Sequence, residues 1–284
     1  TQSRSSAASD VYKRQGQVDD YQAYRRLKFG GYANLAVVAE KGIYPDLAHP
    51  SDEETTITLR KKGGIAPQIT RELIINDNVG AISLIPSELA LSAARTLYEE
   101  VFDVLTGNTT YTVDSVALFH SSHGANTGTT ALSLAGVDVA SVAMRSQTRA
   151  LATDNTLGAQ NEPRFLVVPN ELTGLAERIA NPSQSFHLTA TADTEDADNV
   201  DRWANRLEVI TCDYFTDATE HYFVADPKSI MGIEVVFLGG QEEPELFFQR
   251  GNEGEGWTMD VESIKIRHEY RTGLHDFRPF YRST

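Results

Sequence analysis

One stretch of the sequence, residues 32–70, is rich in strand-forming residues but has few that could build a core of its own. Residues 55–60 read TTITLR, and alternating β-branched residues of this kind are typical of an exposed strand. Turn-forming residues precede this strand, and two lysines and two glycines end it. The stretch therefore predicts an extended arm or long hairpin with flexible joints. Because such an arm cannot cover its own apolar residues, we expect it to bury them on a neighbouring molecule.

A long amphipathic helix is expected next, over residues 86–105. Its apolar residues recur at intervals of three and four, which places them in one stripe along the helix. Ser83 is a candidate N-cap, Pro86 falls in the first turn, and Gly107 follows the last turn. A helix of about twenty residues is about 30 Å long. This length is sufficient for a spine that supports a whole domain.

The remaining sequence predicts helices and strands in the middle of the chain and strands toward its end. Residues 135–149 and 172–179 have the spacing of amphipathic helices, and FLVV at residues 165–168 is a short buried strand. Together with the strands of the last third, this order indicates an α+β fold. Five strands are expected there, at residues 207–212, 221–225, 233–238, 245–249 and 263–270.

Composition excludes several classes of protein. The 284 residues are 40% hydrophobic, enough for one large domain or two modest ones, and no apolar run is long enough for a membrane-spanning helix. The net charge of −15 argues against simple electrostatic binding to nucleic-acid phosphates or to an anionic membrane. The single cysteine, Cys212, cannot form an internal disulfide, and it makes a cysteine-based zinc site improbable.

Two polar segments stand apart from the expected core. Residues 1–15 read TQSRSSAASDVYKRQ, which resembles a translated vector or adaptor tail, so we expect this segment to be non-native. Ten acidic residues against two arginines lie between Asp193 and Asp226. We expect the most acidic part, residues 190–201, to be a solvated surface loop.

The search for catalytic or metal-binding motifs finds only one weak pattern, His120 and His123 in a polar loop. Two histidines at this spacing can bind a metal, but a zinc site needs a third ligand. The sequence has no HExxH helix, no GxSxG turn, no phosphate-binding loop and no GxGxxG motif. Cys212 follows apolar residues, as a buried structural thiol would. We therefore predict no catalytic, cofactor-binding or metal-binding residues, and a protein that is not an enzyme.

The order and spacing of many short segments resemble a known family. From about residue 29 to residue 282 the chain is similar to tailed-bacteriophage major capsid proteins with the HK97-like fold, specifically the Mu-like major head subunit group. The matching segments are residues 42–44, 52–59 and 62–64 in the arm, 69–72 with 76–77 before the long helix, 118–120 with 123–126, 143–144 with 147, 163–169, 226–227, 233–238, 243–244 and 265–268.

The resemblance implies how the chain is divided. The expected segments are a non-native tail at residues 1–15, an N-terminal arm remnant at 16–31, an E-loop hairpin at 32–70, a peripheral domain with the spine helix at 71–134, an axial domain at 135–226, and returning peripheral-domain strands at 227–284.

The resemblance also implies a function. The chain would be a structural subunit of an icosahedral phage head, located in the virion and assembled in the cytoplasm of the bacterial host. It would form pentamers and hexamers around its axial domain, with the E-loop lying over a neighbouring subunit. These would enclose double-stranded DNA without reading its sequence. Its partners would be copies of itself, with scaffold, prohead protease and portal proteins, and no membrane.

Two alternatives remain open at this stage. An encapsulin-like nanocompartment shell would share the fold but package enzymes. A metal-dependent hydrolase using His120 and His123 belongs to a different class and would need stoichiometric metal at that loop. A further question concerns Lys61 and Lys62, because an E-loop lysine in related shells can form an isopeptide crosslink with an asparagine. We predict no crosslink in this chain.

Overall fold

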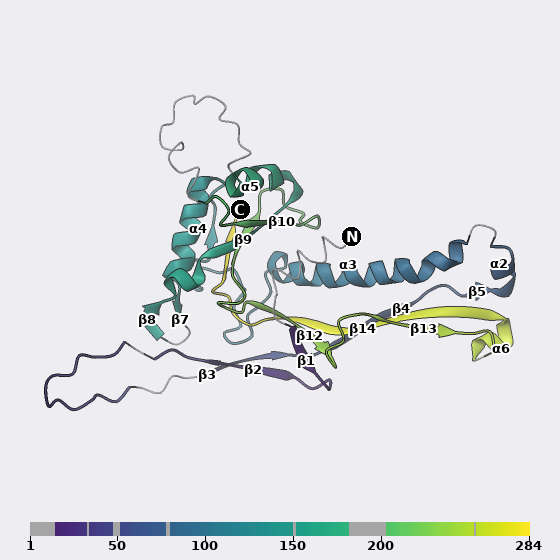
Figure 1. Ribbon diagram of the computed structural model, residues 1–284, viewed down its shortest axis with the longest axis horizontal. Coiled ribbons are helices and arrows are strands. Elements are labelled where there is room, and N and C mark those ends of the chain that lie inside the picture. The colour runs from purple at the N-terminus through teal and green to yellow at the C-terminus, as the bar shows by residue number, and fades with distance from the viewer. Residues whose placement is uncertain are drawn as a thin grey trace, which may run out of the picture.

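The computed structural model is an elongated α+β molecule (Figure 1). It describes residues 15–32, 34–47, 52–77, 80–149, 152–181, 203–252 and 254–284. The predicted acidic loop at residues 190–201, and all but the last residue of the predicted tail, lie outside these ranges. No helix in the described ranges is long and apolar enough to cross a membrane.

A six-stranded sheet built around one long strand forms the extended half of the molecule. This strand, β14 (Val261–Leu274), has neighbours on both sides, since Lys265 is opposite Phe247 on one side and Ile65 on the other. All of its partners run antiparallel to it, and β1 runs parallel to β12. The other five strands are β12 (Ile233–Leu238), β13 (Glu245–Gln249), β4 (Arg60–Ile65), β5 (Ile69–Thr70) and β1 (Gln15–Val18).

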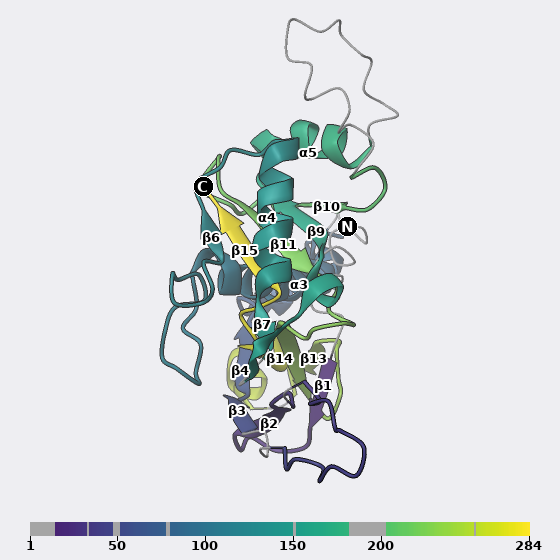
Figure 2. The same ribbon diagram turned by 90° about the vertical axis from the view of Figure 1, so that its left-hand side faces the viewer.

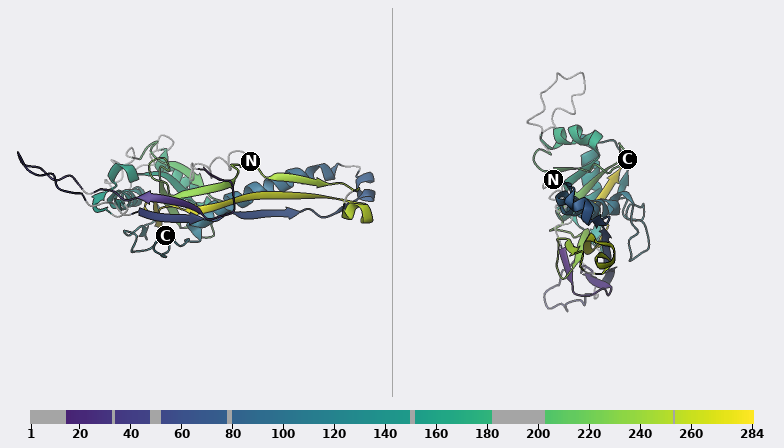
Figure 3. Two further views of the ribbon diagram at one scale, coloured as in Figure 1. Left: turned by 90° about the horizontal axis from the view of Figure 1, so that it is seen from below. Right: turned by 90° about the vertical axis from the view of Figure 1, so that its right-hand side faces the viewer.

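The long helix α3 (Ile85–Thr106) lies along this sheet, as the first and third figures show (Figures 1 and 3). Its C-terminal half is the buried part, where Val101 and Leu105 are fully inaccessible to solvent. The predicted spine helix is therefore confirmed. The predicted N-cap is wrong, because the 3₁₀ turn η1 (Ala81–Leu84) precedes α3 and the Ser83 hydroxyl donates to Gly80 O at 2.6 Å.

A five-stranded sheet forms the other half, and both of its faces are covered. Helices α4 (Leu134–Ser146) and α5 (Thr173–Ala180) lie on one side of this sheet (Figure 2). Within β9 (Pro163–Val168), Leu166 and Val168 pack toward these helices, whereas Phe165 and Val167 pack toward α3. This double burial explains the uninterrupted apolar run FLVV. The remaining strands of this sheet are β10 (Glu208–Thr211), β11 (His221–Ala225), β15 (Phe280–Ser283) and β6 (Thr127–Gly128).

The final strand departs from the expected division of the chain. The sequence assigns residues 227–284 to the returning peripheral-domain strands, but β15 pairs with β11 and β6 in the five-stranded sheet. Its aromatic residues account for this position, because Phe280 belongs to the core beneath α3 and Tyr281 to the core beneath α4. The predicted strands at 221–225, 233–238 and 245–249 are confirmed, and the one expected at 263–270 extends over Val261–Leu274.

The arm is a separate two-stranded hairpin of β2 (Tyr24–Phe29) and β3 (Asp52–Ile57). The hairpin therefore begins earlier than the expected residue 32, and it ends before β4, which belongs to the six-stranded sheet. Residues 34–38 form no strand. The short elements not yet named are α2 (Arg71–Ile75), β7 (Thr148–Arg149), β8 (Ala152–Thr156), η2 (Gly158–Asn161), η3 (Asn170–Leu172) and α6 (Glu255–Met259).

The two glycines of β4 yield a matched pair of variants. A Cβ atom on Gly63 would lie 2.4 Å from the backbone oxygen of Ile266, whereas a Cβ on Gly64 meets no atom within 4 Å. We expect Gly63→Ala to destabilise the subunit by about 1–3 kcal/mol through this overlap. Gly64→Ala should be neutral or stabilise it by up to about 1 kcal/mol, because it restricts the unfolded chain.

Thermal unfolding of the two variants beside the unchanged chain measures this difference. A loss of 1 kcal/mol lowers Tm by about 2–4 °C in a protein of comparable size. Equal Tm values for Gly63→Ala and Gly64→Ala would contradict the close approach of β4 to β14.

Candidate functional site

The predicted histidine loop does not bring its two imidazoles together as metal ligands. His123 is buried, its Nδ1 lies 2.9 Å from Leu118 O, and its Nε2 lies 2.7 Å from an Asp114 carboxylate oxygen. Its ring stacks on Phe277 with centroids 3.9 Å apart. Both nitrogens of His123 therefore already have partners within the fold. His120 is exposed, and its Nδ1 lies 2.8 Å from the Ser122 hydroxyl.

The loop instead fixes the path of the chain between α3 and α4. The Asn126 side chain donates to Leu118 O at 2.8 Å and accepts from His120 N at 3.1 Å. The Gln147 side chain donates to His123 O at 2.8 Å. Among the residues that the structure describes, no group of three or more His, Cys, Asp or Glu side chains could hold a metal ion. The arrangement therefore favours a structural role for the loop over a hydrolase.

The single cysteine is also placed for packing. Cys212 is 1% exposed within the core beneath α3, and burial raises the pKa of its thiol. A raised pKa keeps the thiol protonated and unreactive at neutral pH. This position agrees with the structural thiol expected from its apolar neighbours in the sequence.

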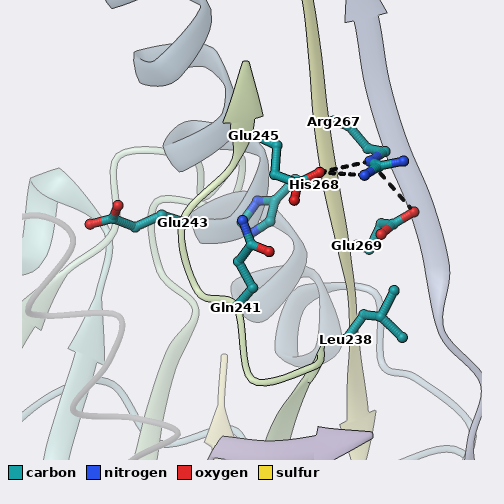
Figure 4. Close-up of a pocket in the computed structure, with 7 residues that line it drawn as sticks. All are labelled: Leu238, Gln241, Glu243, Glu245, Arg267, His268 and Glu269. Atoms are coloured by element: carbon teal, nitrogen blue, oxygen red, sulfur yellow. Dashed lines mark hydrogen bonds and ion pairs between the residues drawn. The ribbon is translucent and has the colours of Figure 1, made fainter. Parts of the chain in front are cut away.

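A small pocket near the turn between β12 and β13 has an ion pair among its lining residues (Figure 4). The Arg267 guanidinium donates to the Glu245 carboxylate at 3.0 Å and lies 3.9 Å from that of Glu269. The cavity volume of about 10 Å³ is close to the space that one water molecule needs.

A larger groove of about 460 Å³ runs between α3 and β4, with Lys62, Thr96 and His268 among its lining residues.

Of the lysines considered for crosslinking, Lys62 is engaged within its own subunit, whereas Lys61 is exposed and lies 3.8 Å from the Glu269 carboxylate. Both lie on β4 opposite β14, and not in the loop of the arm. The Lys62 ammonium contacts the Glu100 carboxylate and lies 3.2 Å from the Tyr270 hydroxyl. Burial, with Arg271 nearby, lowers the pKa of Lys62 to about 8, and contact with Glu100 opposes this by favouring the charged form.

The apolar side chains with the highest exposed fractions lie at the two ends of the molecule. In the arm, Val37 is 100% exposed and Ile43 is 95% exposed. At the opposite end, which we call the distal end, Trp257 of α6 is 77% exposed and Ile75 of α2 is 69% exposed (Figures 1 and 3). Exposed apolar residues gathered in this way mark surfaces that contact another molecule. The sequence predicted the arm surface, but it did not reveal the distal one.

A third exposed apolar surface lies on α4. Val142 is 68% exposed and Val139 is 49% exposed, one turn apart on the same side of the helix. The opposite side of α4, with Val137 and Met144, packs on the five-stranded sheet. α4 is therefore apolar on both sides, which is typical of a helix with a further partner.

Comparison with known proteins gives one family and a shared fold. A sequence profile described as phage capsid protein matches residues 52–283. No curated protein matches the chain. Among solved structures, the chain is similar to one of Microbacterium phage Oxtober96, with 10% identity, a TM-score of 0.61, and coverage of 98% of this chain and 90% of that one.

Two further structures have the same fold. The capsid of a native GTA particle is 14% identical, with a TM-score of 0.64 and coverage of 98% of this chain and 89% of that chain. The capsid of the cyanophage P-SCSP1u is 8% identical, with a TM-score of 0.63 and coverage of 96% of this chain and 86% of that chain. At these identities the likeness establishes the fold, and it extends over nearly the whole chain.

Three buried histidines predict how stability depends on pH. Burial lowers the pKa of His221, His268 and His275, so each remains neutral in the fold at a pH where it would be charged in the unfolded chain. The unfolded chain then binds more protons, and stability should fall as pH decreases below about 6.5.

Urea unfolding between pH 7.5 and pH 5.5 measures this dependence. His268→Gln should reduce the loss of unfolding free energy over this range, because one of the three titrating groups is gone. A loss equal to that of the unchanged chain would show that the burial of His268 does not contribute.

The position of both lysines on β4, outside the loop of the arm, predicts that particles contain no covalent multimers. Denaturing gel electrophoresis of particles formed by this chain should give one band at the mass of a single subunit. A ladder of multimers that disappears in Lys61→Arg or in Lys62→Arg would contradict this expectation, since arginine keeps the charge but cannot form the isopeptide.

Proposed function

The chain belongs to the phage capsid protein family, and from this premise we propose how its exposed surfaces join copies of it into a shell. It is a major capsid protein with an HK97-like fold, a structural subunit of an icosahedral phage head and not an enzyme. We propose that the subunits form pentamers and hexamers in which each arm lies across the neighbouring subunit. The protein is located in the virion.

The exposed arm is the observation that carries this proposal. Leu35, Val37, Ile43 and Tyr44 are each more than four-fifths exposed, and β2 and β3 pair only with one another among the strands that the structure describes. Burying one such aliphatic side chain on a neighbour contributes about 1.5–3 kcal/mol. Several of them on one arm supply a substantial association energy without any change in the body of the subunit.

The three apolar surfaces suggest separate contacts in the shell. The arm and the surface that it would cover differ, so the contact is heterologous. A heterologous contact forms a closed ring when its rotation is a whole fraction of a turn, as in a pentamer or hexamer. We propose that α4, with Val139 and Val142, faces the next copy around the ring axis. The distal end, with Trp257 and Ile75, would then contact subunits of adjacent rings. This arrangement assigns a partner surface to each exposed apolar group.

The acidity of the chain is compatible with a shell that encloses double-stranded DNA without gripping it. A net charge of −15 opposes tight binding to phosphates. We further propose that assembly occurs in the cytoplasm of the bacterial host and involves scaffold, prohead protease and portal proteins. The membership of the Mu-like group stays a prediction, as does the division of the chain into arm, peripheral and axial segments.

A single charge in the arm tests the proposed contact. Val37→Asp should leave the subunit folded, because Val37 makes no contribution to its core, but it should impair assembly. Burying an unpaired carboxylate against a neighbour costs several kcal/mol, and each 1.4 kcal/mol is about tenfold in affinity. The subunit concentration needed for shells should rise at least about tenfold.

The matched control is Val113→Asp, the same substitution at a partly exposed valine of the body. Light scattering after size-exclusion chromatography and electron microscopy measure assembly, and circular dichroism measures folding. If Val37→Asp assembles at the same concentration as the unchanged chain, the arm does not make the contact proposed here.

A further inference from the structure

The arm is attached to the body mainly through side chains at its base. β2 and β3 form their own two-stranded sheet, so no ladder of backbone hydrogen bonds continues from them into either large sheet within the described residues. Their side-chain partners are the crossover, residues 275–279, which joins β14 of the first sheet to β15 of the second, and the buried Glu234 of β12, which accepts from the Arg26 guanidinium of β2 at 3.0 Å. These side-chain contacts therefore decide how the arm leaves the body, and those with the crossover involve both strands of the hairpin.

A buried ion pair makes the first of these contacts. The Lys28 ammonium of β2 contacts the Asp276 carboxylate of the crossover, and their side chains are only 15% and 3% exposed. Asp276 also accepts from the Arg278 guanidinium at 3.0 Å and from Arg278 N at 3.2 Å. Burial alone would raise the pKa of Asp276, but Lys28 and Arg278 hold it below its ordinary value, so the carboxylate is charged.

Strand β3 makes the other contacts. The Thr55 hydroxyl lies 3.0 Å from His275 Nδ1, and both side chains are buried. Glu53 accepts from the Tyr111 hydroxyl at 3.2 Å and lies 3.8 Å from the Lys28 ammonium. Both strands of the hairpin are thus bound to the body, Lys28 and Thr55 at the crossover and Glu53 at Tyr111, in one buried polar cluster.

These contacts have directional requirements that apolar packing lacks. A buried charge is strongly destabilised unless its partner stays within hydrogen-bonding distance, so a hinge motion that separates Lys28 from Asp276 is costly. The apolar contacts at the base, such as Ile57 against Val236, are less specific about angle. The polar cluster therefore restricts the direction of the arm more than the apolar contacts do.

Four side chains form what we call the arm latch: Lys28, Thr55, His275 and Asp276. We propose that the arm latch fixes the direction in which the arm leaves the body and thereby places its apolar loop on the neighbouring subunit. The first half concerns the isolated subunit alone, and the second half rests on the proposed function. Lys28 and Thr55 act here as positioning residues, since neither contributes to the exposed surface of the arm loop.

The direction of the arm can be measured by electron paramagnetic resonance. Nitroxide labels would be placed on Glu40→Cys in the arm loop and Ser146→Cys on α4, both exposed, with the buried Cys212 replaced by alanine. The full chain is used, diluted with unlabelled chain, and the unassembled fraction is measured. The unchanged latch should give a single narrow distance distribution.

The test variant is Lys28→Met/Thr55→Val, which removes both contacts to the crossover but keeps the Asp276–Arg278 pair and the Arg26–Glu234 pair. The matched control is Arg25→Met/Thr56→Val, which makes equivalent changes on the exposed side of the same strands. We expect the test variant to lose the narrow distance while its body still melts cooperatively, and the control to retain it. Lys28→Met alone, expected to broaden the distribution less, serves if the double variant does not fold.

Several results would overturn the latch. A narrow distance distribution in the test variant would do so, and so would a broad distribution in the unchanged chain. Equal broadening in the test and control variants would also reject the latch, because it would indicate a general loss of hairpin stability. Each is read on single subunits, so the proposed contact between subunits is not involved. If the test variant keeps the narrow distance but assembles poorly, the latch is rejected. The proposed contact between the arm and the neighbouring subunit would not be contradicted by that result.

Discussion

The pairing of β14 on both of its sides is the constraint on which the rest of the structure depends. A strand of 14 residues is about 46 Å long, and β12 and β13 follow one another along one of its sides while β4 and β5 follow along the other. This sheet is narrow and long, and α3 covers only one of its faces (Figure 3). An elongated body has much surface for its volume, so the ends of the sheet cannot be covered by the same chain. The exposed apolar residues of the distal end follow directly from this geometry.

The crossover after β14 joins the extended half to the compact half and to the arm. Within a few residues, His275 and Asp276 bind the arm hairpin, Phe277 stacks on His123, and Phe280 enters the core beneath α3. The histidine loop, which the sequence presented as a candidate metal site, is thus part of the same junction. Polar residues that resembled a catalytic cluster serve here to hold three parts of the subunit in fixed relation. Such rigidity suits a subunit whose exposed arm has to meet a neighbour at a defined place.

Local patterns predicted the elements whose burial shows as a regular apolar stripe or as an uninterrupted apolar run. The apolar stripe of residues 86–105 gave α3, and the FLVV run gave β9, because helix and strand periodicity follow from burial within a few residues. The base of the arm was missed because β2 reads YRRLKF, whose three basic residues do not resemble a strand. Its partner Asp276 lies 248 residues away from Lys28, and no local pattern reports such a pair. The burial of His123 and the entry of β15 into the second sheet likewise depend on contacts between distant segments.

The central claim is that the apolar arm of one subunit is covered by another, and cryo-electron microscopy of shells formed by this chain tests it most directly. A reconstruction in which residues 34–47 of each subunit lie against the neighbouring subunit, with Val37 and Ile43 inaccessible to solvent, is the predicted result. Shells in which these residues project into solvent, or fold back onto their own subunit, would contradict the account.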